Sequence, residues 1–100
     1  MKNQPTEFSI RGIPSYIRRE WKALLYRRSN VCALCDEYLD PQYTNQHPMQ
    51  ITLDHILPVK EGGRAILSNL QLAHFRCNTL RGSLSVKDAR DMLTRRLGKG

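Results

Sequence analysis

The sequence predicts a small α+β domain with one helix at its N-terminal end and one at its C-terminal end. A metal site is expected to stabilise it. Three observations support this fold class: an amphipathic segment near each end of the chain, an alternating segment in its middle, and two pairs of metal-ligand residues. One hundred residues make at most a single domain with a modest core. Domains of this size often depend on a structural metal or a similar staple.

The N-terminal part is expected to be a flexible basic arm over 1–13, followed by a single domain over 14–100. A helix is predicted over 14–29, because Pro14 suits the first turn of a helix and apolar residues recur at helical spacing after it. These apolar residues are Ile17, Trp21, Leu24 and Leu25. The next segment, 31–39, contains two cysteines and is predicted to form a tight zinc knuckle.

The second half of the chain is predicted to hold one strand and two helices. Residues 50–56 alternate in side-chain character, which is typical of a strand. Ser68 is followed three residues later by Gln71, a capping-box pattern that predicts a helix over 69–81. A last helix is predicted over 85–97, with an acidic residue in its first turn and an apolar stripe. The stripe consists of Val86, Ala89, Met92, Leu93 and Leu97.

The cysteine content and the absence of long apolar segments indicate the cellular compartment of the protein. Three cysteines cannot all pair in disulfides, and the chain shows neither an apolar run of membrane length nor a signal-peptide pattern near its start. We therefore expect a cytoplasmic protein without a membrane partner, in which cysteines serve as metal ligands or thiols. Nothing in the sequence predicts the oligomeric state.

The net charge of +7 is concentrated near the two ends of the chain. Residues 11–28 carry +5 and residues 81–100 carry +4, whereas residues 29–80 carry −2. Such basic arms could hold the phosphates of DNA around a metal-holding centre. The alternative is that they are ordinary solvated helix faces.

Two pairs of residues have the spacing of zinc ligands. Cys32 and Cys35 form a C-x2-C pair, and His74 and Cys77 are three residues apart on the predicted helix, hence on one side of it. Together they make a Cys3His set, which is typical of a closed structural zinc site. Taken singly, Cys77 could be a small buried hydrophobe and His74 a core histidine. Two pairs at ligand spacing favour zinc.

A second site is indicated by Asp54 and His55. They are adjacent, so on a strand their side chains leave opposite faces, and a distortion at the strand end is needed to bring both to one site. Asn78 follows Cys77 by about 100° around a helix and can therefore face away from the zinc. Oxygen ligands suit Mg²⁺ or Mn²⁺, and a neutral imidazole beside such an ion could take a proton from water.

Taken together, these residues resemble the HNH endonucleases, the ββα-metal nucleases. The separations of 14 residues from His55 to Asn69 and of 9 from Asn69 to Asn78 are similar to those of the family motif. The resemblance covers 31–82 and implies a ββα-metal core over 50–82. The matching text is Leu53-Asp54-His55-Ile56-Leu57-Pro58, Gly62-Gly63, Asn69-Leu70-Gln71 and Cys77-Asn78, with Gly82 beyond.

The resemblance also implies roles. His55 corresponds to the general base, Asp54 and Asn78 to ligands of a catalytic Mg²⁺ or Mn²⁺, and Asn69 to a catalytic-site residue that braces the loop beside the base. Two positions depart from the commonest pattern: a histidine stands where a zinc-binding cysteine is more frequent, and an asparagine occupies the last position of the motif. The structural zinc ligands carry over to Cys32, Cys35, His74 and Cys77.

The sequence thus predicts a metal-dependent endonuclease that hydrolyses DNA phosphodiester bonds. The main alternative is a non-catalytic zinc module that binds DNA or recruits a partner. Such a module would have no use for Asp54, His55, Asn69 and Asn78 together. A second alternative is an RNA-cleaving nuclease built on the same site. Digestion of DNA and of RNA would distinguish it.

Overall fold

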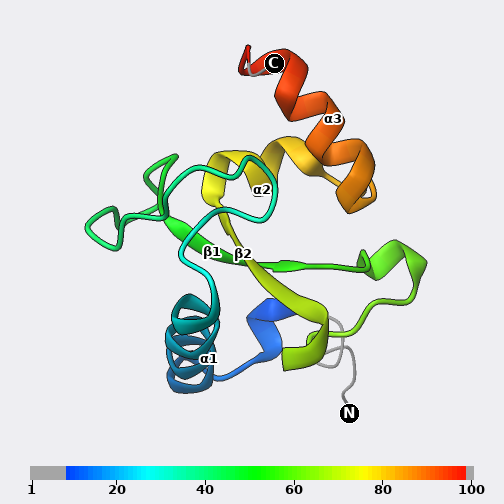
Figure 1. The fold of residues 1–100 in the computed structure, drawn as a ribbon. Coiled ribbons are helices and arrows are strands. Elements are labelled where there is room, and N and C mark those ends of the chain that lie inside the picture. The colour runs from blue at the N-terminus through cyan, green and yellow to red at the C-terminus, as the bar shows by residue number, and fades with distance from the viewer. Residues whose placement is uncertain (1–8, 99–100) are drawn as a thin grey trace.

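The computed structural model describes residues 9–98, which form three helices around one β-hairpin (Figure 1). Figure 1 shows the two strands in the middle of the molecule, with α1 on one side of them and α2 and α3 on the other. A small α+β domain is therefore present, as predicted. In chain order the elements are α1 (Ser15–Arg28), β1 (Ile51–His55), β2 (Leu70–His74), α2 (Phe75–Arg81) and α3 (Val86–Arg96).

Helix α1 packs its apolar stripe onto the hairpin. Ile17, Trp21 and Leu25 are partly buried against the core, as their helical spacing predicts. Before the helix, residues Ile10–Gly12 form one turn of 3-10 helix, and Ile13 is buried. The flexible arm expected over 1–13 is therefore an ordered turn from residue 9 onward; the rest of that expected arm lies outside the described residues.

The hairpin is antiparallel, and its register sets the positions of the site residues. Leu53 lies opposite Leu72, and both are buried in the core. Asp54 lies directly opposite Gln71. Because side chains at directly opposed positions stand on the same face of a sheet, the register brings these two polar groups together.

The predicted helix over 69–81 is wrong in its first half. Residues Leu67–Asn69 form a 3-10 turn, Leu70–His74 form strand β2, and the helix begins only at Phe75. Residues 70–74 pair with β1 although the capping-box pattern favours a helix. Leu70 and Leu72 alternate along this strand, and both side chains are buried in the core. Pairing with β1 gives this segment both backbone hydrogen bonds and apolar burial, which a short isolated helical turn could not match.

The knuckle between α1 and the hairpin is held by backbone hydrogen bonds. Cys32 N donates to Glu37 O at 2.8 Å, and Asp36 N donates to Cys32 O at 2.9 Å. Helix α3 fastens this turn from outside, because Arg90 pairs with the Asp36 carboxylate and donates to Ala33 O at 2.7 Å. The knuckle therefore lies between α3 and the hairpin.

Helix α3 matches its prediction closely. The Ser85 hydroxyl accepts a hydrogen bond from Asp88 N at 3.1 Å, which caps the first turn. Ala89 and Leu93 of its apolar stripe are buried. The helix thus completes the core on the side of α2.

Candidate active site and metal centre

A pocket of about 210 Å³ opens at the end of β1, and three of the four residues predicted for the catalytic site line it, whereas Asn69 does not. Asp54 and His55 come from β1, and Asn78 comes from α2. His55 is the last residue of β1, so the chain leaves the regular strand there, and both neighbouring side chains line the same pocket. The other lining residues are Pro58, Val59, Lys60, Arg81, Gly82 and Ser83.

Asp54 is a buried carboxylate with one oxygen held in place. Its Oδ2 accepts hydrogen bonds from Gln71 Nε2 at 2.9 Å and from Arg81 Nη1 at 2.7 Å. Burial raises the pKa of Asp54, while the hydrogen bond from Gln71 and the charge of Arg81 oppose that rise. Both fixed contacts fall on Oδ2, so Oδ1 is the oxygen that could meet a cation.

The orientation of the Asn78 amide is fixed by its neighbours. Its Nδ2 donates to Leu53 O and to Thr52 Oγ1, each at 3.1 Å. A backbone carbonyl only accepts hydrogen bonds, so the nitrogen of the amide must lie on that side. The amide oxygen is thereby left as the ligand atom that Asn78 can offer.

Arg81 is a member of this site that sequence reasoning missed. It is 2% exposed and donates hydrogen bonds to the Asp54 carboxylate and to the backbone oxygens of His55, Ile56 and Leu84. A signal was present in the sequence, since Arg81 follows Asn78 by three residues and therefore shares its helix face. Gln71 was missed because its position opposite Asp54 depends on the hairpin register.

Asn69 lies in the loop between the strands and contacts its backbone at several points. Its Oδ1 accepts from Leu57 N at 2.9 Å, and its Nδ2 donates to Leu57 O at 3.1 Å and to Arg64 O at 2.9 Å. The loop packs so closely here that a Cβ on Gly63 would lie 1.7 Å from Leu57 O. The Asn69 side chain thus connects the segment just after His55 with the residues before β2.

The second cluster consists of the four residues proposed for zinc. Cys32, Cys35, His74 and Cys77 are all buried, and their ligand atoms lie within 4.8 Å of one another. His74 Nδ1 is 3.4 Å from Cys35 Sγ and 3.8 Å from Cys77 Sγ. A tetrahedral zinc with ordinary bond lengths would place its ligand atoms about 3.6–3.8 Å apart. The cluster is therefore a candidate zinc site of the right size.

The surroundings of His74 and Cys32 suit metal ligation. His74 Nε2 lies 3.0 Å from Tyr38 O, and since that carbonyl only accepts, Nε2 carries the proton and Nδ1 presents its lone pair to the thiols. Cys32 Sγ accepts the backbone N–H groups of Leu34 and His74, each at 3.4 Å. His74 reaches the cluster from the end of β2 rather than from the helix on which it was predicted to lie.

The three thiols affect one another strongly. Hydrogen bonds from the Cys35 and Cys77 thiols, followed by those from backbone N–H groups, lower the pKa of Cys32. Hydrogen bonds with the Cys32 and Cys35 thiols, together with burial, raise the pKa of Cys77. Three buried thiolates would need a cation beside them, and Zn²⁺, which accepts thiolate and imidazole ligands, suits such a set.

The chain belongs to the HNH endonuclease family, whose model matches residues 32–84 and so covers both the cysteine–histidine cluster and the pocket at the end of β1. The match confirms the resemblance seen in the sequence and associates the protein with nuclease-type function and nucleic-acid binding. Comparisons with curated proteins and with solved structures gave no significant match. No helix within residues 9–98 is long and apolar enough to cross a membrane.

Proposed function

We propose that this protein is a metal-dependent endonuclease that hydrolyses DNA phosphodiester bonds in the pocket at the end of β1. The observation that carries the proposal is the convergence of Asp54, His55 and Asn78 on that one pocket, although Asn78 comes from a different element. The neighbouring Arg81 donates a hydrogen bond to the Asp54 carboxylate. The family match over residues 32–84 supports a nuclease reading of this arrangement.

In this proposal each residue has a separate task. His55 takes a proton from the attacking water, because a neutral imidazole is a suitable base near neutral pH. Asp54 and Asn78 hold a divalent ion through their oxygens, a donor set that suits Mg²⁺ or Mn²⁺ rather than zinc. When bound, that ion would neutralise charge on the phosphate and on the departing oxygen. Asn69 braces the loop that follows His55.

The cysteine–histidine cluster has a structural task in the same proposal. Four protein ligands fill a tetrahedron and leave no position for substrate. A zinc ion held by Cys32, Cys35, His74 and Cys77 would tie the knuckle to the end of β2 and the start of α2. Since α2 also carries Asn78, the zinc would help to fix one wall of the catalytic pocket.

The test is digestion of supercoiled plasmid by purified protein, with and without added Mg²⁺ or Mn²⁺. Nicked or linear products are expected only with a divalent ion. His55→Ala should lower the rate by about 10²–10⁴-fold, the usual contribution of a general base, while a gel-shift assay should show that DNA is still bound. His47→Ala is the matched control, because His47 is exposed and lies outside the pocket.

Three outcomes would count against the proposal. Cleavage by His55→Ala at the wild-type rate would remove His55 as the base. Binding of DNA with no cleavage under either metal would favour the non-catalytic zinc module. Faster digestion of a structured RNA than of plasmid under the same conditions would identify an RNA-cleaving enzyme on the same site.

A further inference from the structure

The pocket at the end of β1 contains a lysine to which the proposed function gives no task. Lys60 lines this pocket together with Asp54, His55 and Asn78. It lies in the 3-10 turn Val59–Glu61, in the loop that follows β1, and its side chain is exposed. The pocket that brings the proposed base and the proposed metal ligands together therefore also carries a solvent-accessible cation.

The two cations that line the pocket differ in what they contact. Arg81 Nη1 is 2.7 Å from Asp54 Oδ2, and both of these side chains are buried. Arg81 also donates hydrogen bonds to three backbone oxygens, so its donors already serve the protein itself. Lys60 instead has an exposed ammonium on a flexible four-carbon stem. Of the two cations, Lys60 is the one that can meet an anion entering from solvent.

The backbone at Lys60 is held by hydrogen bonds of the loop. Glu61 N and Gly63 N both donate to Pro58 O, at 2.9 and 3.0 Å. Just before this turn, the Asn69 side chain makes two hydrogen bonds with the loop backbone. These contacts fix the point from which the lysine stem starts, relative to the strand end that carries the proposed base. The ammonium can therefore reach the pocket without any movement of the backbone.

The carboxylate next to Lys60 in the sequence does not share the pocket. Glu61 follows Lys60 directly, but only Lys60 lines the pocket. Successive residues of a 3-10 helix are about 120° apart around its axis, so the two side chains leave the turn in different directions. The turn thus presents a cation to the pocket and keeps the neighbouring carboxylate outside it.

A cation in this place has a use in phosphodiester hydrolysis. When water attacks phosphorus, its oxygen forms the new bond while its proton passes to His55, and the bond to the departing oxygen breaks. Negative charge on the oxygens around phosphorus is then higher than in the bound diester. A cation beside these oxygens therefore stabilises the transition state more than the substrate, which raises the rate.

We propose that the Lys60 ammonium contacts a non-bridging oxygen of the scissile phosphate and that Lys60 is a catalytic residue. The proposal rests on the proposed nuclease function and adds a substrate contact to it. Because the group that is recognised is the phosphate itself, the contact should form with a free phosphate as well as with DNA. Binding of phosphate can therefore be measured apart from cleavage.

The first experiment uses inorganic phosphate as the probe and follows backbone amide signals by NMR, without added Mg²⁺ or Mn²⁺. Shifts are expected at Val59 and Ser83, which line the pocket from two different segments. Lys60→Met should weaken phosphate binding by about fivefold or more, because two unit charges about 4 Å apart attract by that much even in water. No shifts at these positions in the wild type, or equal binding by Lys60→Met, would overturn the proposal.

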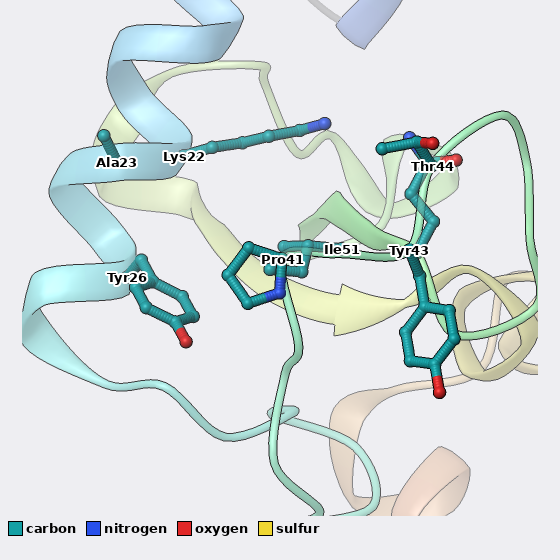
Figure 2. A pocket seen from close by; sticks show the side chains of 8 residues that line it. Lys22, Ala23, Tyr26, Pro41, Tyr43, Thr44 and Ile51 are labelled. Carbon is teal, nitrogen blue, oxygen red and sulfur yellow. The ribbon is translucent and has the colours of Figure 1, made fainter.

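Lys22→Met is the matched control for the titration, because it also replaces a pocket lysine by methionine. Figure 2 shows Lys22 extending from α1 in a different pocket, which Pro41 and Ile51 also line. That pocket shares no lining residue with the one at the end of β1. Lys22→Met should therefore leave phosphate binding at the catalytic pocket unchanged. Equal losses in the two lysine variants would indicate a general effect of net charge and overturn the contact.

The second experiment distinguishes the scissile phosphate from its neighbours in DNA. Bis(p-nitrophenyl) phosphate is a diester with a single phosphate, so a residue that holds a flanking phosphate cannot affect its hydrolysis. With Mn²⁺, Lys60→Met should lower both kcat/KM for this diester and the rate of plasmid cleavage at saturating DNA by about tenfold to a hundredfold. Loss of a buried donor to a developing anion costs about 10²–10³-fold, and Lys60 is exposed, so a smaller loss is expected.

Two further variants complete the kinetic test. Lys60→Arg keeps the charge and should recover most of the rate. Arg64→Met is the control, because Arg64 is an exposed cation of the same loop outside the pocket, and the backbone carbonyl that Asn69 contacts is retained. A loss on plasmid without a loss on the small diester would assign Lys60 to a flanking phosphate and overturn the proposal. The titration needs no cleavage, so a protein that binds phosphate through Lys60 but cuts neither substrate would refute only the proposed function.

Discussion

Arg81 is a buried cation whose hydrogen bonds go to one carboxylate and to backbone oxygens. It connects the Asp54 side chain with the backbone at His55 and Ile56, and so joins the end of β1 to α2. Its five donors lie in a rigid plane, which lets one side chain satisfy several acceptors at once. At the scale of a single residue, Arg81 therefore affects both the charge and the shape of the candidate catalytic pocket.

Removal of this side chain should be costly. Arg81→Met would leave the Asp54 carboxylate buried without its cation, and loss of one partner of a buried pair costs about 3–5 kcal/mol in the free energy of unfolding. Urea denaturation would measure the loss. Adding Asp54→Asn to Arg81→Met should recover part of it, because the unpaired charge is then gone.

The control for Arg81 is an exposed ion pair. Lys87 and Asp91 pair on the surface of α3 at 3.0 Å, and Lys87→Met should leave the denaturation midpoint almost unchanged. Arg81→Lys keeps the charge but lacks the planar fork, so it should fall between wild type and Arg81→Met. Wild-type stability in Arg81→Met would show that the buried pair contributes nothing.

The loop between β1 and β2 is the element that places His55 relative to Asn69. Gly62 adopts a positive φ of 91°, and Gly63 approaches the Leu57 carbonyl so closely that it has no room for a side chain. Asn69 then fastens both edges of the loop through three hydrogen bonds. Gly62 and Gly63 let the loop backbone pass close enough to Asn69 for its side-chain amide to form these hydrogen bonds.

Gly63→Ala tests this arrangement. The added Cβ would overlap Leu57 O and would also lie 2.9 Å from Asn69 Nδ2, so the loop must shift. We expect a loss of about 1–3 kcal/mol in stability, the usual cost of overpacking, together with a loss of cleavage. Glu61→Ala in the same loop is the control, because Glu61 is exposed and lies outside the pocket. Full activity and stability in Gly63→Ala would mean that the loop does not position the base.

The whole molecule has a small core, and its cohesion should depend on metal. Three of the buried core residues are cysteines of the candidate zinc site, and His74 is buried beside them. Small zinc domains gain about 10–16 kcal/mol from the metal, so stripping zinc with a strong chelator should unfold much of this domain. Circular dichroism and elemental analysis would follow the loss together.

Variants separate the two proposed metal sites. Cys77→Ala should unfold the protein, whereas Asn78→Ala should keep its zinc and its fold but lose cleavage. The two residues are neighbours on α2, so a difference between them would reflect the site each one faces rather than its place in the chain. A folded, zinc-free wild-type protein would contradict this assignment.

The charge of the whole molecule predicts how it binds DNA. If the basic ends of the chain hold phosphates, the logarithm of affinity should fall with the logarithm of salt concentration by about 0.9 per phosphate neutralised. Reversing Arg95 and Arg96 at the end of α3, or Arg19 on α1, should flatten that slope alike for all sequences. Slopes equal to that of wild type would mean that these ends are only solvated surface.

Much of this protein was determined by the sequence alone. The helices α1 and α3 follow from apolar spacing, and the four candidate zinc ligands follow from two short pairs of residues. The HNH-like motif in the sequence also pointed to Asp54, His55 and Asn78, which the structure brings to one pocket. These features are local, because a helix stripe, a ligand pair or a motif is complete within a short stretch of chain.

Only the tertiary structure decided the identity of β2 and the partners of Asp54. A strand needs a second strand to satisfy its backbone, so the local helical pattern at Ser68–Gln71 could not reveal that residues 70–74 pair with β1. Gln71 and Arg81 meet Asp54 from 17 and 27 residues away. Such contacts arise from register and packing between elements, and those are fixed only when the apolar faces of the hairpin and helices close around one core.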